Sequence, residues 1–131
     1  MKRMEDDRGK FVVIAAGYKD KMEEFMQVNP GLASRFTHKL QIDDYNEDEL
    51  LAIFKGMAHK DQYSLSPAAE FKLLDKIYRL VVNKGDNWGN AREMRNLLDA
   101  TVQRLSERVS QMPSDQVTKE TYQIIQPEDI E

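Results

Sequence analysis

Asn29-Pro30-Gly31-Leu32-Ala33-Ser34-Arg35-Phe36 is the stretch around which the rest of this sequence is organised. Proline cannot continue a preceding helix and biases Asn29 away from helical angles, while Gly31 can adopt the backbone angles of a reversal. We therefore predict a tight, polar corner after a helix. This corner would hold the Arg35 side chain at a fixed place on the surface.

One helix and two strands are predicted to flank this corner. Residues 11–16 form a continuous apolar run, which is typical of a strand covered on both faces in a parallel sheet. A short helix follows, with Asp20 and Glu23 as its capping pair, and it must stop near Pro30. Beyond the corner, residues 38–42 alternate between apolar and polar side chains, which predicts a shorter, half-exposed strand.

From Asn46 almost to Met112 the apolar period becomes 3.6, which predicts three helices. Their capping signals are, in chain order, Asn46 with Glu49, Ser66 with Pro67, and Asn90 with Glu93. The side chains expected on their buried faces are Leu50, Ile53, Phe54 and Met57, then Phe71, Leu74, Ile77, Tyr78 and Val81, then Met94, Leu97, Leu98, Val102, Leu105 and Val109. We place a domain boundary near Tyr45.

The composition limits the classes of function. With 131 residues, of which 40% are hydrophobic and 32% charged, the chain is long enough for one modest domain or a piece of a larger one. A net charge of -4 disfavours a nucleic-acid binder or an anionic-membrane binder. There is no cysteine, and the two histidines, His38 and His59, are too isolated for a metal site. Residues 1–8 lack the apolar core of a signal peptide, so we expect a cytoplasmic protein without a membrane span.

Two arginines lie in the first turns of the last predicted helix. Arg92 and Arg95 are three residues apart, at the positive end of the helix dipole, where a cation is unfavourable by roughly 0.3–1 kcal/mol. In one interpretation, Arg95 pairs with Asp99 and Arg92 points to solvent. In the other, both arginines bind an anion, because helix N-termini with added guanidinium groups are good phosphate sites. The residues alone leave both interpretations open.

Four motifs occur together in one order. They are Val12-Val13-Ile14-Ala15-Ala16-Gly17-Tyr18, Asn29-Pro30-Gly31-Leu32-x-Ser34-Arg35-Phe36, Asp44-Tyr45-x-x-Asp48-Glu49-Leu50 and Gly89-Asn90-Ala91-Arg92-x-x-Arg95-Asn96. Over roughly residues 10–110 the chain resembles the C-terminal half of AAA+ ATPases. The closest branch contains the red-type Rubisco activase, the stage V sporulation protein K-like ATPases and the type VII secretion ATPases.

The resemblance implies a mainly α fold with a small α/β remnant. Residues 1–45 would be a truncated C-terminal part of the AAA+ P-loop core, with two short strands plus a helix. Residues 46–112 would be a helical-bundle lid, and residues 113–131 a tail with a short strand-like segment. In the family's strand order, 5-1-4-3-2, the two expected strands are neighbours only through a strand that this chain lacks.

The resemblance also implies roles for single residues. Arg35 matches the arginine finger, which reaches the γ-phosphate bound by a neighbouring subunit and would be catalytic. Arg92 matches sensor 2, with Arg95 as a supporting candidate for nucleotide binding. Tyr18 occupies the sensor-1 position, where Asn or Thr is more usual. ATP with Mg²⁺ would be the cofactor of the intact protein. The Walker A loop, the Walker B acid and the pore loop would precede residue 1, so we expect the isolated chain to bind no nucleotide and to be monomeric and inactive.

The implied function is chaperone-like remodelling of a protein substrate by a ring of subunits, in this family a hexamer, driven by ATP hydrolysis. A second reading is a helical protein-interaction adaptor with no nucleotide chemistry. A third reading, a helix-turn-helix nucleic-acid binder that uses Arg92 and Arg95, conflicts with the acidic balance of the chain.

Overall fold

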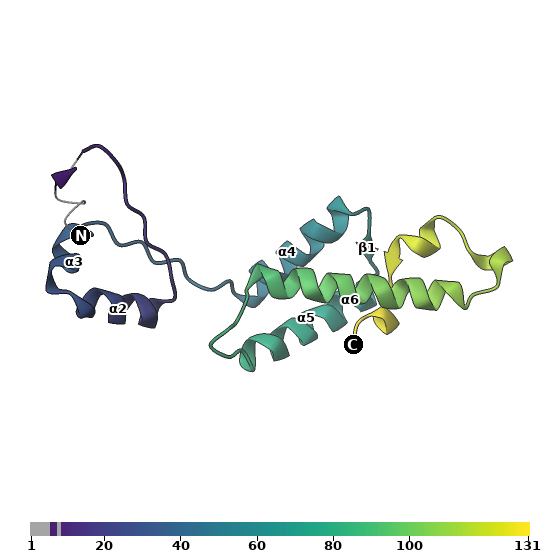
Figure 1. Ribbon diagram of the computed structural model, residues 1–131. Coiled ribbons are helices and arrows are strands. Elements are labelled where there is room, and N and C mark those ends of the chain that lie inside the picture. Colours follow the sequence, from purple (N-terminus) through teal and green to yellow (C-terminus); the bar gives the residue numbers. More distant parts are fainter. Residues whose placement is uncertain (1–5, 8) are drawn as a thin grey trace. The chain divides into compact units, whose positions relative to one another are not determined.

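The computed structural model describes residues 6–7 and 9–131, and it forms two compact units, Met1–Asp43 and Asp44–Glu131 (Figure 1). The first unit contains helices α2 (Lys19–Val28) and α3 (Pro30–Arg35). Helix α2 follows Tyr18, and no side chain caps its N-terminus. The predicted capping pair of Asp20 and Glu23 is therefore wrong, because Asp20 already lies inside the first turn.

The predicted corner is itself a short helix. Asn29 is the N-cap of α3, and its side chain accepts a hydrogen bond of 3.0 Å from the amide of Gly31. Pro30 is the first helical residue, where its missing amide hydrogen costs nothing. The chain changes direction at the extended Asn29, and Gly31 is helical instead of reversing the chain as expected. Leu32 is buried.

The two strands predicted in the first unit are not formed. Residues 11–16 and 38–42 belong to no helix and no strand. Val12 and Ile14 are each 86% exposed, and Leu40 and Ile42 are each 94% exposed. A strand is stabilised by hydrogen bonds to a neighbour and by burial of its faces, and these segments obtain neither here. Their apolar patterns are those of strands, but the partner strand is missing from the described residues.

The second unit consists mainly of helices and has a small parallel sheet, which confirms the predicted fold class. Its long helices are α4 (Glu47–Lys60), α5 (Pro67–Val82) and α6 (Ala91–Ser110). Strand β1 (Ser64–Leu65) pairs in parallel with β2 (Ile124–Ile125), with Ser64 opposite Ile124. Three short 3₁₀ helices complete it: η1 (Ser114–Gln116), η2 (Glu120–Tyr122) and η3 (Pro127–Asp129).

The N-terminal caps of α4 and α5 are those that the sequence predicts. The Asn46 side chain accepts from the Glu49 amide at 2.8 Å, and the Glu49 carboxylate accepts from the Asn46 amide at 3.0 Å. Ser66 accepts from the amide of Ala69 at 3.2 Å, and Pro67 is the first residue of α5. Each cap satisfies amides that would otherwise lack a partner, which is worth about 1 kcal/mol per helix.

The predicted core faces are right for α4 and α6 and partly wrong for α5. Fully buried positions of α4 and α6 include Leu50, Phe54, Met94, Leu98, Leu105 and Val109. In α5 the buried residues are Ala69, Leu73 and Ile77, whereas Phe71 is 80% exposed and Tyr78 is 58% exposed. Helix α5 carries apolar side chains on two faces, so periodicity alone does not identify which face is buried.

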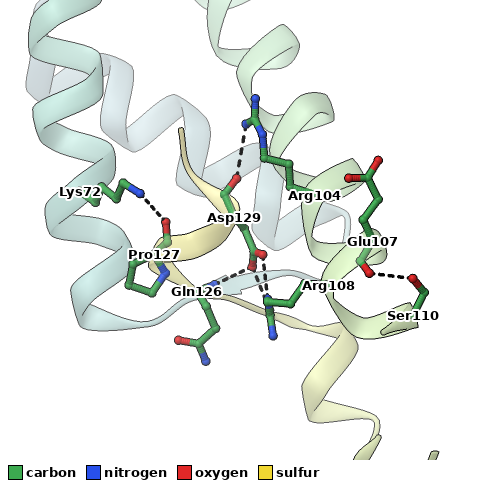
Figure 2. A network of polar contacts seen from close by, with 8 residues as sticks. All are labelled: Lys72, Arg104, Glu107, Arg108, Ser110, Gln126, Pro127 and Asp129. Carbon is green, nitrogen blue, oxygen red and sulfur yellow. Dashed lines mark hydrogen bonds and ion pairs between the residues drawn. The ribbon is translucent and has the colours of Figure 1, made fainter. Parts of the chain in front are cut away.

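The C-terminal segment completes the core of this unit. Ile125 and Ile130 are fully buried, and so is the carboxylate of Asp129. Arg108 donates to both Asp129 oxygens, at 2.8 and 2.9 Å, and the Gln126 amide donates to Asp129 at 2.9 Å (Figure 2). The hydrogen bonds that Arg108 donates to Asp129 raise the pKa of Arg108. The short strand-like segment predicted in the tail is confirmed as β2, and Ile125 of this strand belongs to the core of the unit.

We predict that Asp129→Ala destabilises the second unit by about 3 kcal/mol, because it leaves a partly buried guanidinium and the Gln126 amide without their shared partner. Glu128→Ala is the matched control, since Glu128 is an exposed neighbour, and it should change stability by less than about 0.5 kcal/mol. Urea unfolding followed by circular dichroism measures both. Equal effects of the two substitutions would contradict the role given to Asp129.

Candidate functional site

Two of the predicted site residues lie in the first unit. Tyr18 immediately precedes α2, and its side chain is 60% exposed. Arg35 is the last residue of α3 and is half-buried. Its Nη1 donates to the carbonyl oxygen of Gly31 at 2.9 Å, one turn earlier in the same helix. The guanidinium of Arg35 is therefore oriented by its own helix.

The other two predicted site residues, Arg92 and Arg95, occupy the first two turns of α6, but their surroundings differ. Arg95 donates to Asp61 at 3.0 Å and lies 3.7 Å from Asp99. Hydrogen bonding to Asp61, and more weakly the charges of both carboxylates, raises the pKa of Arg95. Arg92 is exposed and has no ion-pair partner among residues 6–7 and 9–131. The pairing of Arg95 with Asp99 agrees with the first of the two interpretations of these arginines, whereas neither interpretation includes the shorter pairing with Asp61.

The turn that leads into α6 has an unusual backbone. Asn90 has φ 51° and ψ -117°, the angles of the first central residue of a type II′ turn. The Arg92 amide donates to the Gly89 carbonyl at 3.0 Å and closes this turn. Glycine adopts such angles most easily, and another residue is held there at a cost of about 1–3 kcal/mol. The strained residue Asn90 thus belongs to the turn that sets the backbone position of Arg92.

The side chain of Asn90 does not cap α6, so the predicted capping pair with Glu93 is wrong. Instead, Asn90 Oδ1 accepts from the Tyr45 amide at 3.0 Å, and Asn90 Nδ2 donates to Asp44 at 2.9 Å. Lys84 donates to the other oxygen of Asp44 at 3.0 Å. Hydrogen bonds from Asn90 and then from Lys84 lower the pKa of Asp44. The sequence gives no sign of this cluster, because capping is the usual role of Asn before a helix.

The loop between α5 and α6 is attached to the core by its aromatic residue. Trp88, the single tryptophan of the chain, is half-buried and packs against the hydrophobic core of the second unit. It fixes the loop to the helices of this unit. The chain therefore enters the turn at Gly89 from an anchored position, which limits the freedom of the turn that precedes Arg92.

Comparison with known families accounts for this arrangement of helices. Residues 46–131 match the family model described as an AAA lid domain. The chain belongs to the AAA lid domain family. The matched region includes α4, α5, α6 and the C-terminal segment, so it contains Asn90 and both arginines of α6. Asp44 and Tyr45, the partners of Asn90, directly precede it.

Curated relatives of the lid confirm the resemblance to the AAA+ branch that includes Rubisco activase. The chain is 42% identical over 127 residues to the chloroplastic ribulose bisphosphate carboxylase/oxygenase activase of Cyanidioschyzon merolae, which covers 97% of the chain and 43% of that protein. It is 41% identical over 106 residues to protein CfxQ of Xanthobacter flavus, with 81% and 33% covered. Protein CbbX of Cereibacter sphaeroides is 35% identical over 127 residues, with 97% and 40% covered. The chain thus spans less than half the length of these relatives.

Residues 6–7 and 9–131 contain no group of three or more His, Cys, Asp or Glu side chains arranged to bind a metal ion. Within the same residues, no helix combines the length and the apolar character that crossing a bilayer requires.

We predict that Asp44 makes the stability of the lid depend on pH. Its pKa in the folded lid lies below the ordinary value of 3.8. Its stabilising contribution is therefore fully present above pH 3.8 and is lost as the pH falls through the lower, folded pKa. The stability difference between the wild-type chain and Asp44→Asn should shrink on going from pH 7 to strongly acidic pH.

Urea unfolding at several pH values measures this difference. Asp86→Asn is the matched control, because Asp86 is an exposed carboxylate of the α5–α6 loop with no hydrogen bond or ion pair in the described part of the chain. A difference between wild type and Asp44→Asn that is constant with pH, or that matches the control, would contradict the assignment.

Proposed function

We propose that this chain supplies the lid of an AAA+ ATPase, and that Arg92 acts as its sensor 2 by contacting the phosphates of ATP bound to the same subunit. The observation that carries the proposal is the exposure and the lack of charge compensation of Arg92. It is an exposed cation in the first turn of α6, without an ion-pair partner among the described residues, beside helix amides that favour an anion. Membership of the AAA lid family supports the proposal that this anion is a nucleotide.

The surroundings of Arg95 favour a different role. Its guanidinium is compensated by Asp61, at the C-terminal end of α4, and by Asp99 on α6. A cation that already has two carboxylate partners gains less from a phosphate, because those pairs must be weakened first. We therefore assign Arg95 to the attachment of α6 to α4, and we assign the contact with nucleotide to Arg92.

The chemistry of the donor set fits ATP. A guanidinium group is planar and always charged, and it can donate two parallel hydrogen bonds to phosphate oxygens. In the intact protein, ATP with Mg²⁺ would supply the phosphoryl group that is transferred to water. Arg92 would neutralise negative charge on the phosphates from the lid side. The position of the lid would therefore depend on whether ATP or its hydrolysis product is bound.

We further propose that Arg35 is the arginine finger, which acts on nucleotide bound by a neighbouring subunit of a ring. Its hydrogen bond to Gly31 fixes the direction of the side chain along α3, as a group that must meet a phosphate at a defined place requires. Tyr18 has an exposed phenol at the sensor-1 position of the motif, where it would contact nucleotide or the attacking water. Remodelling of a protein substrate is the proposed output of the ring.

A protein-interaction adaptor is the second candidate, and one observation favours it. Phe71, Leu74 and Tyr78 form an exposed apolar face on α5, spaced for one side of a helix. An adaptor would lose its partner when this face is changed, and it would be indifferent to Arg92. The two candidates therefore respond to different substitutions.

The test requires the residues that precede this chain in the family. We propose a chimera in which the chain replaces the matching 127-residue segment of the Cyanidioschyzon merolae relative. We expect the chimera to hydrolyse ATP. Arg92→Ala should lower kcat at least about tenfold, and Arg35→Ala by about 10³, because each removes a cation that stabilises the transition state.

Arg79→Ala is the matched control, since Arg79 is an exposed arginine of α5 whose partner, Asp75, lies on the same helix. It should leave kcat within about twofold of the unsubstituted chimera. A kcat that is unchanged by Arg92→Ala would refute the sensor-2 assignment, and a kcat unchanged by Arg35→Ala would refute the finger assignment.

The isolated 131-residue chain should not hydrolyse ATP. The described residues supply arginines that can contact phosphates from one side, and in this family the phosphates are held mainly by the Walker A loop. Phosphate release by the purified chain, compared with the same preparation carrying Arg92→Ala, measures this. Turnover that is lost on Arg92→Ala would contradict the expectation, whereas turnover that persists unchanged would indicate a contaminating ATPase.

A further inference from the structure

We infer that Asn90 is a positioning residue that ties the start of the lid to the turn carrying Arg92. This inference rests on the proposed role of Arg92 and adds a means by which the position of that residue is controlled. Asn90 is two residues before Arg92, and its own backbone angles form the turn that the Arg92 amide closes. Its side chain binds a segment 45 residues earlier in the sequence.

The backbone angles at position 90 do not explain why its side chain is Asn. Glycine would adopt φ 51° and ψ -117° freely, so the backbone of the turn gives no reason for Asn. The carboxamide, in contrast, uses both of its ends. Its oxygen accepts from the Tyr45 amide, and its nitrogen donates to the Asp44 carboxylate. The side chain therefore serves the contact with residues 44 and 45, and the strained backbone is the cost of that contact.

The contact attaches Asp44 and Tyr45 to the turn before α6. Asp44 is the first residue of the second unit, and Lys84 holds its other carboxylate oxygen. Asp44 and Tyr45 are thus attached to the α5–α6 loop at one side and to the turn before α6 at the other. A displacement of the chain at Asp44 would pull on Asn90, and through the peptide units of the turn on Arg92. These contacts therefore couple the position of residues 44–45 to the position of Arg92.

The contact can be tested in the chain itself by amide hydrogen exchange. Asn90→Gly keeps the turn and removes the carboxamide, so exchange at the Tyr45 amide should become at least about tenfold faster. Exchange at the Phe54 and Leu98 amides, in the interiors of α4 and α6, should stay within about twofold, because the core is untouched. Exchange at Tyr45 that is unchanged in Asn90→Gly would overturn the inference.

A swap of donor and acceptor provides a rescue. Asn90→Asp alone places two carboxylates together and should speed exchange at Tyr45. The double variant Asn90→Asp, Asp44→Asn restores a donor opposite an acceptor, and should return Tyr45 exchange to within about threefold of wild type. If the double variant exchanges as fast as Asn90→Asp alone, the paired geometry is not what protects Tyr45, and the inference fails.

The action through Arg92 is tested by a double-mutant cycle in the ATP-hydrolysing chimera. Asn90→Gly should lower kcat about tenfold when Arg92 is present and by less than about twofold when Arg92→Ala is also present. An equal loss in both backgrounds would show that Asn90 does not act through Arg92. If Arg92→Ala itself has no effect, the proposed function fails and this inference fails with it. If Arg92→Ala has its effect and Asn90→Gly has none, only the inference is overturned.

Discussion

Burial of one stripe of α6 is the constraint on which the lid depends. Met94, Leu98 and Leu105 are almost fully buried, and α6 packs against α4 and the C-terminal segment along its length. The ion pair of Arg108 with the buried Asp129 fixes the far end of the helix, and the turn at Asn90 fixes the near end. A side chain in the first turn of such a helix has a defined position, because neither end of the helix can shift without exposing apolar surface or separating a buried ion pair.

Because α6 is held at both ends, the charged side chains in its first turns have defined positions. Of the two arginines in its first turns, Arg95 is paired with carboxylates of α4 and α6, and Arg92 has no such partner in the described residues. The dipole of the helix and its first amides disfavour a further cation at this end. An arginine without a carboxylate partner is therefore destabilising at this end of the helix, and a bound phosphate would remove this unfavourable interaction. The account of function follows from this difference between two arginines three residues apart.

Most features that the sequence predicts correctly depend on local chemistry, although the capping pairs predicted for α2 and α6 are wrong. Features that depend on partners distant in the sequence were missed. The Asn46 and Ser66 caps and the buried stripes of α4 and α6 follow from spacing along one helix. The strands at residues 11–16 and 38–42 failed because a strand exists only with a neighbour. For the site, the motifs named both arginines of α6, but a positive φ at Asn90 and its bonds to Asp44 and Tyr45 are properties of the assembled lid.

In the proposed function, Arg92 contacts the phosphates of ATP. The most direct test of this contact is the equilibrium affinity for ATP of the chimeric protein and of its Arg92→Ala variant, measured by titration alongside Arg79→Ala. The account predicts a Kd at least about tenfold higher for Arg92→Ala, which corresponds to about 1.4 kcal/mol of binding free energy, and an unchanged Kd for Arg79→Ala. Equal Kd values for all three proteins would contradict it.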